Sequence, residues 1–377
     1  MNKSLTFASI KIRTMERGVI LNKALTGKDL SLQESLFLYD KVPLPVLFDT
    51  ANRLRQKIIP GNSVSWQIDR NVNYTNVCIS KCKFCTFHCT LSQKEKAFTT
   101  SESEYRLKIE ELIAYGGDQL LLQGGLHPQY DIHFYENLFS TLKIIYPQIK
   151  LNALGPPEVY HIAKRSNLTI KDTLIRLRDS GLTSLPGAGA EILSDRVRNI
   201  VSPGKPGVNA WSEVIMCAHS LNIPTTATMV YGHIETIEER INHLLLIREI
   251  QNKKPKNHIG FTAFICWPMQ TKGTKLSEEF VTITPSAVEN LKMIAISRIV
   301  LNNIPHIQAS WLTMGKDTAK LALHCGADDM GSVMMEENVV SSTGLRYTMS
   351  KEEMVRTIKE AGFDPWLRNQ DYSPKHI

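Results

Sequence analysis

The chain has 377 residues and a formal net charge of +7, with 42% apolar and 21% charged residues. These values are typical of globular proteins and exclude a disordered, collagen-like or low-complexity chain. The basic residues are dispersed, which argues against a nucleic-acid partner. No run of about 18 apolar residues occurs, which argues against a transmembrane helix and a membrane partner.

The cysteines indicate a reducing compartment. Four of the seven fall between Cys78 and Cys89, whereas a disulfide framework favours an even number spread along the chain. Clustering of this kind points to a metal site. Residues 1–20 carry charges between their apolar residues and do not resemble a signal peptide. We therefore expect a cytoplasmic protein.

Along the chain, residues 27–60 are predicted to be helical, and Pro60-Gly61-Asn62 ends this region in a turn. Short β-rich runs then alternate with amphipathic helices. The predicted strands are 64–71, 119–123, 150–154, 183–185, 225–231, 260–266, 306–312 and 329–333. This alternation predicts parallel strands joined by helices.

Local signals mark where several of the helices begin. Ser101 with Glu104, and Thr236 with Glu239, have the spacing of capping boxes, so a helix is expected to start after each Ser or Thr. The last helix is expected to start near Ser350.

Eight strand–helix units in succession predict an α/β fold, a TIM-like (β/α)8 barrel over residues 62–365. It would follow a helical extension at residues 1–61 and precede a tail at residues 366–377. Periodicity alone leaves open a doubly wound open sheet. In a barrel, the chemistry lies at the carboxyl ends of the strands. Polar and glycine-rich segments concentrate at those ends here.

The strongest chemical signal is Cys78-x3-Cys82-x2-Cys85, directly after the first strand. Thiolates are soft ligands that suit zinc or an iron–sulfur cluster. Structural zinc normally takes four ligands, so a zinc-binding interaction module would need a fourth Cys or His. Three thiolates on a 4Fe–4S cluster leave one iron open to a ligand from outside the protein.

With Phe84 before its last cysteine, this motif resembles the signature of radical S-adenosylmethionine (SAM) enzymes. The resemblance implies a 4Fe–4S cluster held by the three cysteines, SAM on the open iron, and a one-electron reductant of the flavodoxin or ferredoxin type. Cys89 is interpreted as a free thiol rather than a fourth ligand. The family usually continues with Ala-Phe-Tyr-Arg after the motif, where this chain has Thr86-Phe87-His88-Cys89.

The same resemblance suggests cofactor-binding residues at two further strand ends. Gln123-Gly124-Gly125 ends the second strand, where such enzymes have a glycine motif whose backbone meets SAM, since glycine allows close approach. Its usual third residue is acidic, but Leu126 stands here. Glu191, at the end of a glycine-rich turn, is a candidate for binding hydroxyl groups, although a first-turn Glu that favours the helix dipole is an equal alternative.

Other polar and aromatic residues at strand ends are candidates for the substrate site. His233 and Glu235 are the catalytic candidates, as acceptors of a proton. The candidate substrate-binding residues are Glu158, Tyr231, Trp267, Gln270, Gln308 and Trp311. Packing of the barrel mouth is the alternative role for the aromatic residues among them.

Longer segments resemble the dehypoxanthine futalosine cyclases of menaquinone biosynthesis. They are 68–78, 121–128, 156–158, 189–193, 226–233, 307–311 and 336–340. This resemblance implies that a 5′-deoxyadenosyl radical removes hydrogen from the ribose C4′ of dehypoxanthine futalosine, followed by ring closure. A sister radical SAM enzyme, either an aminofutalosine synthase or a deazaflavin-precursor synthase, is the nearest alternative.

Overall fold

The computed structural model describes residues 17–270, 272–280, 282, 284–338 and 348–375. Parts of four predicted segments lie outside these residues: 1–16 of the extension, 271, 281, 283 and 339–347 of the barrel, 376–377 of the tail, and 339–340 of the last cyclase-like segment. None of the helices in the described ranges has the length and apolar character needed to cross a membrane.

The predicted barrel is confirmed, and its strands form two parallel sheets that meet. The strands are β1 (Ser63–Gln67), β2 (Asp69–Asn73), β3 (Gln119–Gln123), β4 (Lys150–Ala153), β5 (Leu182–Ser184), β6 (Thr225–Tyr231), β7 (Phe261–Pro268), β8 (His306–Gln308), β9 (Asp329–Ser332) and β10 (Asp364–Leu367). One sheet has the order β10-β1-β9-β8-β7-β6 and the other β2-β3-β4-β5.

Two junctions close these sheets into a barrel. The first predicted strand is in fact two: β1 pairs with β9 and β10, and β2, after Ile68, pairs with β3. The chain therefore passes from one sheet to the other within a single extended segment. At the opposite junction, Leu185 forms a parallel bridge with Thr225 at the start of β6.

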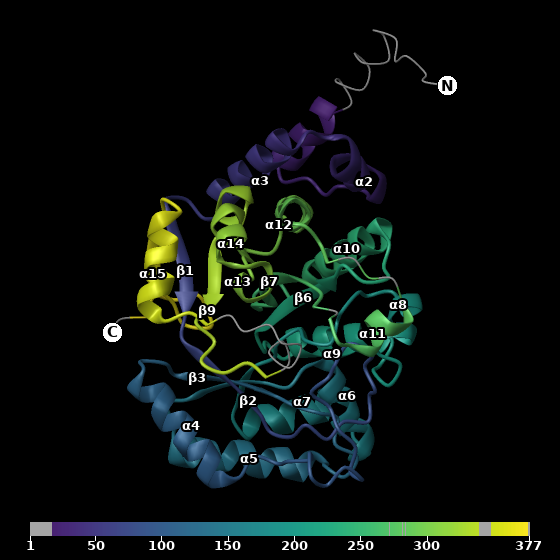
Figure 1. The fold of residues 1–377 in the computed structure, drawn as a ribbon, viewed down its shortest axis with the longest axis vertical. Coiled ribbons are helices and arrows are strands. Elements are labelled where there is room, and N and C mark those ends of the chain that lie inside the picture. The colour runs from purple at the N-terminus through teal and green to yellow at the C-terminus, as the bar shows by residue number, and fades with distance from the viewer. Residues whose placement is uncertain (1–16, 271, 281, 283, 339–347, 376–377) are drawn as a thin grey trace.

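Helices surround the two sheets (Figure 1). They are α4 (Glu102–Ala114), α5 (Ile132–Ile145), α6 (Pro156–Arg165), α7 (Ile170–Asp179), α8 (Asp195–Val201), α9 (Val208–Ser220), α10 (Ile237–Lys253), α11 (Lys275–Glu279), α12 (Ala287–Val300), α13 (Trp311–Met314), α14 (Lys316–Ala322), the 3-10 helix η1 (Leu323–Cys325) and α15 (Lys351–Glu360). Both predicted capping boxes are present, and Ser350 caps α15.

The predicted N-terminal helical region is interrupted. Helices α2 (Leu32–Lys41) and α3 (Leu44–Ile58) are separated at Pro43, since proline cannot donate the backbone hydrogen bond that a continuous helix needs. Figure 1 shows both helices at one end of the molecule, next to α12. They cover the outside of the barrel rather than the carboxyl ends of its strands.

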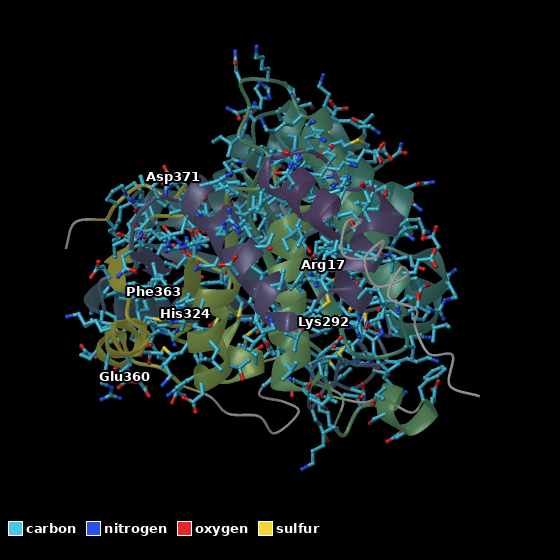
Figure 2. All side chains as sticks on the ribbon, turned by 90° about the horizontal axis from the view of Figure 1, so that it is seen from above. Arg17, Lys292, His324, Glu360, Phe363 and Asp371 are labelled. Carbon is cyan, nitrogen blue, oxygen red and sulfur yellow. The ribbon has the colours of Figure 1, made fainter. Side chains whose placement is uncertain are left out.

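The C-terminal segment closes the amino ends of the strands. Strand β10 crosses the predicted boundary at residue 365 and pairs with β1. The Tyr372 ring then stacks on His306, the first residue of β8, at 3.5 Å, and Lys375 pairs with Asp118 before β3. Nearby, His324 and Phe363 lie together where η1 meets β10 (Figure 2), with ring centroids 4.9 Å apart.

Candidate cofactor and substrate site

The three motif cysteines lie in the loop that follows β2. The Ser80 hydroxyl is 2.9 Å from Cys78 Sγ and 3.4 Å from Cys82 Sγ, and the backbone N–H of Leu126 donates to Cys78 Sγ at 3.3 Å. Cys82 is buried, whereas Cys78 and Cys85 are half-buried. Ser80 thus links the sulfurs of Cys78 and Cys82 at the carboxyl end of the barrel, with donors that favour anionic sulfur, although no three potential metal ligands come together among the described residues.

Cys89 is engaged elsewhere in the same loop. Its thiol donates to Asn76 Oδ1 at 3.3 Å, and its backbone N–H donates to the Asn76 carbonyl at 3.0 Å. The backbone N–H of Phe98 donates to the same side-chain oxygen. Burial raises the pKa of the Cys89 thiol. These contacts favour a structural thiol over a cluster ligand.

The glycine pair at the end of β3 packs closely against the segment that leads into the cysteine loop. A Cβ on Gly125 would overlap the Val77 carbonyl, and one on Gly124 would lie 2.7 Å from the Tyr74 ring. Glycine is therefore required for the close approach of two protein segments. Gln123 is half-buried beside them. SAM binding by these three residues stays a prediction.

Glu158 lies in the first turn of α6, next to the end of β3. The backbone N–H groups of Gly124, Gly155 and Glu158 itself act on its buried carboxylate and favour the charged form. Burial raises the pKa of Glu158 to about 7, although the Lys205 ammonium and these N–H groups oppose the shift. A carboxylate thus lies beside the glycine pair. The family motif usually has an acidic residue at the position of Leu126, and in this chain Glu158 is the acidic residue near that position.

We expect this carboxyl to make stability depend on pH. Its native pKa of about 7 exceeds the ordinary value of 4.5, so the native state binds more protons between these values and its stability falls as pH rises through that window. Compared with the Glu158→Gln variant, the wild type should lose up to about 3 kcal/mol of its free energy of unfolding between pH 5 and 8. Urea unfolding of both proteins at each pH checks this. Parallel pH profiles would contradict it.

Glu191 lies at the centre of a buried ionic group. Its backbone has φ = +42°, and its carboxylate is 2.7 Å from Lys205 Nζ and 3.4 Å from Arg198 Nη1. Burial opposes ionisation, but the two cations hold the pKa of Glu191 below its ordinary value. Glu191 is therefore anionic and already paired.

Lys205 and Arg198 were missed by sequence reasoning. Lys205 lies between two prolines in the segment Ser202-Pro203-Gly204-Lys205-Pro206-Gly207, where rigid turns hold a lysine in place. The proline-flanked lysine could be seen in the sequence, but the sequence did not show that the partners of Lys205 lie at the ends of other strands. Its ammonium interacts electrostatically with Cys82 as well as Glu191, so it connects the cysteine loop to the acidic residues of the mouth.

His233 and Glu235 form a closed pair after β6. His233 Nε2 donates to the Val230 carbonyl at 3.0 Å, and its Nδ1 is 3.0 Å from the Glu235 carboxylate. Glu235 also accepts from the Gly232 N–H at 2.6 Å and from Arg240 at 2.7 Å. Burial lowers the pKa of His233, although Glu235 opposes the shift. Because both side chains are fully enclosed, this placement favours holding the turn over accepting a proton.

The interior of the barrel is open to solvent at its carboxyl end. In β6, Thr226, Thr228 and Val230 are half-buried and alternate with fully buried residues. Successive side chains of a strand face opposite sides, and helices cover the outside, so the half-buried set faces the interior. Trp267 and Gln308 share this inward face through the registers of β6, β7 and β8.

The other predicted substrate residues lie away from the interior. The buried Tyr231 hydroxyl donates to Asn290 of α12 at 2.6 Å, and the Trp311 indole N–H donates to the Ser332 carbonyl at 2.9 Å. The Gln270 amide donates to the Pro268 carbonyl at the end of β7 and to the Thr313 carbonyl of α13, each at 3.2 Å. The expectation of direct substrate contact is therefore not supported for Tyr231 or Trp311, because each faces the helix layer or the core.

Two family models match the chain. The model of the radical SAM superfamily matches residues 72–247, which include the end of β2, the cysteine loop and β3 to β6. The model described as the CofH/MqnC C-terminal region matches residues 258–377, from β7 to the closing segment. Together they cover the barrel from the end of β2 onward, apart from residues 248–257.

Curated relatives of two kinds match along most of the chain. The cyclic dehypoxanthine futalosine synthase of Streptomyces coelicolor is 38% identical, over 94% of this chain and 87% of the relative. The 5-amino-6-(D-ribitylamino)uracil–L-tyrosine 4-hydroxyphenyl transferase of Archaeoglobus fulgidus is 40% identical, over 86% of this chain and 92% of the relative. Identity alone does not separate the two kinds.

Solved structures share the fold at low sequence identity. Methylornithine synthase has a TM-score of 0.70 and 18% identity, covering 92% of this chain and 97% of its own. The FeFe-hydrogenase maturase of Carboxydothermus hydrogenoformans has a TM-score of 0.70 and 17% identity, and the match covers 96% of this chain and 82% of the maturase chain. These likenesses confirm the barrel architecture.

Proposed function

The chain belongs to the radical SAM superfamily, and on that premise we propose that it converts dehypoxanthine futalosine to cyclic dehypoxanthine futalosine in menaquinone biosynthesis. The observation that carries this proposal is the set of cyclase-like segments, 156–158 and 226–233 among them, in a chain that is 38% identical to the Streptomyces synthase over 94% of its length. The open barrel interior supports it, since ring closure within one molecule needs a chamber that holds a single substrate.

The residues of the cysteine loop fit a 4Fe–4S cluster. Cys78, Cys82 and Cys85 would hold it, and three thiolates leave one iron for SAM. The Ser80 hydroxyl and the Leu126 N–H, both within hydrogen-bond distance of Cys78 Sγ, would stabilise the negative charge of bound sulfur. When bound, these cofactors supply a carbon-centred radical that removes a hydrogen atom from a sugar carbon.

The acidic residues of the mouth would bind the polar groups of SAM. Glu158 would accept from its ammonium group beside Gly124, and the paired Glu191 would accept from its ribose hydroxyls. Lys205, which already interacts with Glu191 and Cys82, would offset their negative charge with its ammonium group. These assignments follow from the carboxylates' positions around the cysteine loop.

The inward side chains of the barrel would hold the substrate. Thr228 and Gln308 are uncharged polar groups suited to the hydroxyls of a ribose, and the Trp267 indole N–H has no hydrogen-bond partner among the described residues. A radical reaction requires mainly exclusion of water and fixed distances, not polar activation. His233 and Glu235 would act as positioning residues for the turn after β6.

Isotope transfer tests the proposed reaction. With deuterium at the ribose C4′ of dehypoxanthine futalosine, we expect deuterium in free 5′-deoxyadenosine and a cyclic product lighter by two hydrogens. Mass spectrometry of an anaerobic reaction with SAM and a reductant measures both. An adenosyl group retained in the product would instead identify an aminofutalosine synthase.

The second candidate is a deazaflavin-precursor synthase, which the 40% identity to the Archaeoglobus transferase favours. That relative's name gives it two organic substrates, L-tyrosine and 5-amino-6-(D-ribitylamino)uracil. The two candidates therefore differ in whether one substrate is sufficient. Product formed only when tyrosine and the uracil compound are both present would replace the cyclase assignment with this one.

A further inference from the structure

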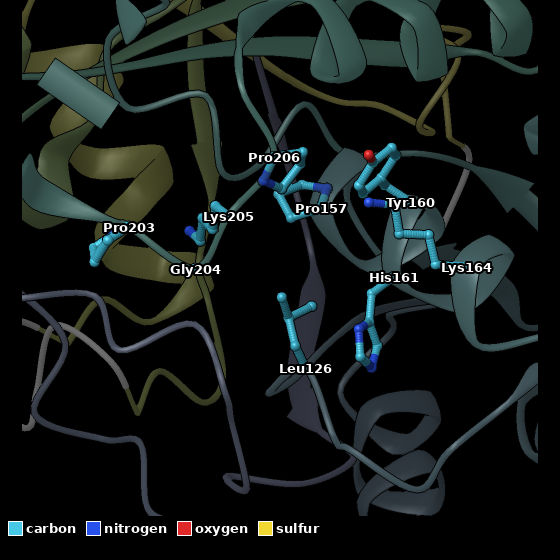
Figure 3. A pocket seen from close by; sticks show the side chains of 9 residues that line it. All are labelled: Leu126, Pro157, Tyr160, His161, Lys164, Pro203, Gly204, Lys205 and Pro206. Carbon is cyan, nitrogen blue, oxygen red and sulfur yellow. The ribbon is translucent and has the colours of Figure 1, made fainter. Parts of the chain in front are cut away.

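A surface pocket of about 280 Å³ lies between α6 and the loop that joins α8 to α9 (Figure 3). Its lining residues are Leu126, Pro157, Tyr160, His161, Lys164, Pro203, Gly204, Lys205 and Pro206. In Figure 3, Tyr160, His161 and Lys164 lie on one side and Pro203, Gly204 and Lys205 on the other. The pocket therefore lies outside the barrel interior assigned above to the substrate.

The floor of this pocket adjoins the cysteine thiols. Leu126 lines it and donates its backbone N–H to Cys78 Sγ at 3.3 Å. Gly204 packs directly on Ser80: its N–H donates to the Ser80 carbonyl at 3.0 Å, and a Cβ there would lie 2.5 Å from Ser80 Cα. Ser80 in turn contacts the sulfurs of Cys78 and Cys82. A single residue thus separates the pocket from two of the proposed cluster ligands.

The pocket continues into an exposed apolar residue of the cysteine loop. Ile79 is 46% exposed, although it directly follows Cys78, and its backbone N–H donates to the Leu126 carbonyl at 3.1 Å. We take Ile79, with the neighbouring Leu126 and the exposed Pro203 of the lining, as the apolar centre of this surface. Large apolar side chains exposed beside a functional group are typical of a protein interface.

Cations surround this apolar centre. Lys81, Lys164 and Arg165 are exposed, and none of them has an ion-pair partner within the part of the chain that the structure describes. Lys164 Nζ lies 4.5 Å from the centroid of the Tyr160 ring, and the charge of Arg165 acts on His161. An apolar centre with an unpaired cationic rim is complementary to an acidic protein surface.

We propose that the pocket, Ile79 and this cationic rim form the docking surface for a small acidic one-electron carrier protein. The inference rests on the proposed function, because it requires a cluster at the three cysteines. One electron passes from the reduced carrier to the cluster, so the carrier is oxidised and the cluster reduced by one electron each, and no bond forms or breaks. The surface suits this role because only Ser80 separates Gly204 of the pocket from the sulfurs of Cys78 and Cys82, and the pocket lies outside the barrel interior.

Charge reversal at the rim tests the proposal. Lys164 and Lys359 are both exposed lysines in the last turn of ten-residue helices, α6 and α15, so Lys359→Glu controls for the same change in charge and helix dipole. Anaerobic stopped-flow absorbance would follow cluster reduction by a chemically reduced acidic flavodoxin, and separately by dithionite, in cluster-loaded protein without substrate.

With flavodoxin at low ionic strength, we expect Lys164→Glu to reduce the second-order rate roughly tenfold, and Lys359→Glu to match the wild type. The difference should shrink at high salt. Dithionite should reduce all three proteins alike. Equal flavodoxin rates for the two variants, or a slower dithionite reaction in Lys164→Glu, would overturn the proposal. Because no substrate is added, failure of the cyclase assignment would leave this result interpretable.

Discussion

Replacing Cys78, Cys82 or Cys85 with Ala is expected to abolish the iron–sulfur chromophore and all SAM cleavage. A cluster held by three thiolates is not retained when one of these ligands is removed. In the Cys78 variant, the Ser80 hydroxyl and the Leu126 N–H also lose the sulfur that they contact. Iron and sulfide analysis should fall from about four of each per chain to near zero. Formation of 5′-deoxyadenosine should fall below detection.

Cys89→Ala is the matched control for this prediction, because it removes a buried thiol from the same loop. Within the described ranges, the one side-chain hydrogen-bond partner of its thiol is Asn76, which still accepts from the Phe98 N–H and donates to the Lys96 carbonyl. The variant should keep its chromophore and its SAM cleavage. If it loses both as Cys82→Ala does, the three-ligand assignment is wrong.

Arg368→Met is expected to destabilise the whole barrel, by about 3–5 kcal/mol. The buried Arg368 guanidinium donates to Asp329 at 2.5 Å and to Gln67 at 2.6 Å, and it stacks 3.9 Å from the Tyr372 ring. Removing it leaves Asp329 buried on β9 without its cation. Met keeps much of the volume, so the loss is mainly electrostatic.

Thermal unfolding measures this effect, and a drop in Tm of about 5 °C or more is expected. Arg356→Met is the control, because Arg356 is an exposed residue of α15 whose ion pairs are 3.8 and 3.9 Å long. Exposed pairs of this kind contribute little, so its Tm should stay near that of the wild type. Equal melting of Arg368→Met and the control would show that the C-terminal segment does not support the barrel.

Features encoded by neighbouring residues could be predicted from the sequence alone. The cysteine motif, the capping boxes at Ser101 and Thr236, and the alternation of strands with helices each depend on spacings of a few residues. Local backbone geometry decides such features, so the barrel and its cysteine loop followed from them. The family resemblance rested on the same contiguous segments.

Features that depend on contacts between distant segments were decided only by the tertiary structure. Alternation along β6 divides its residues into two faces, but only the position of α12 shows that Tyr231 faces outward to Asn290. Likewise, Glu191 gains its cations from Lys205 and Arg198 only because a later loop folds back over the strand ends. The division of the first predicted strand is also tertiary in origin. The segment is split because β1 pairs with β9 in one sheet, whereas β2 pairs with β3 in the other. The sequence by itself therefore determined the barrel and its cysteine loop, whereas long-range packing decided which polar groups face the chamber and which are enclosed by the protein.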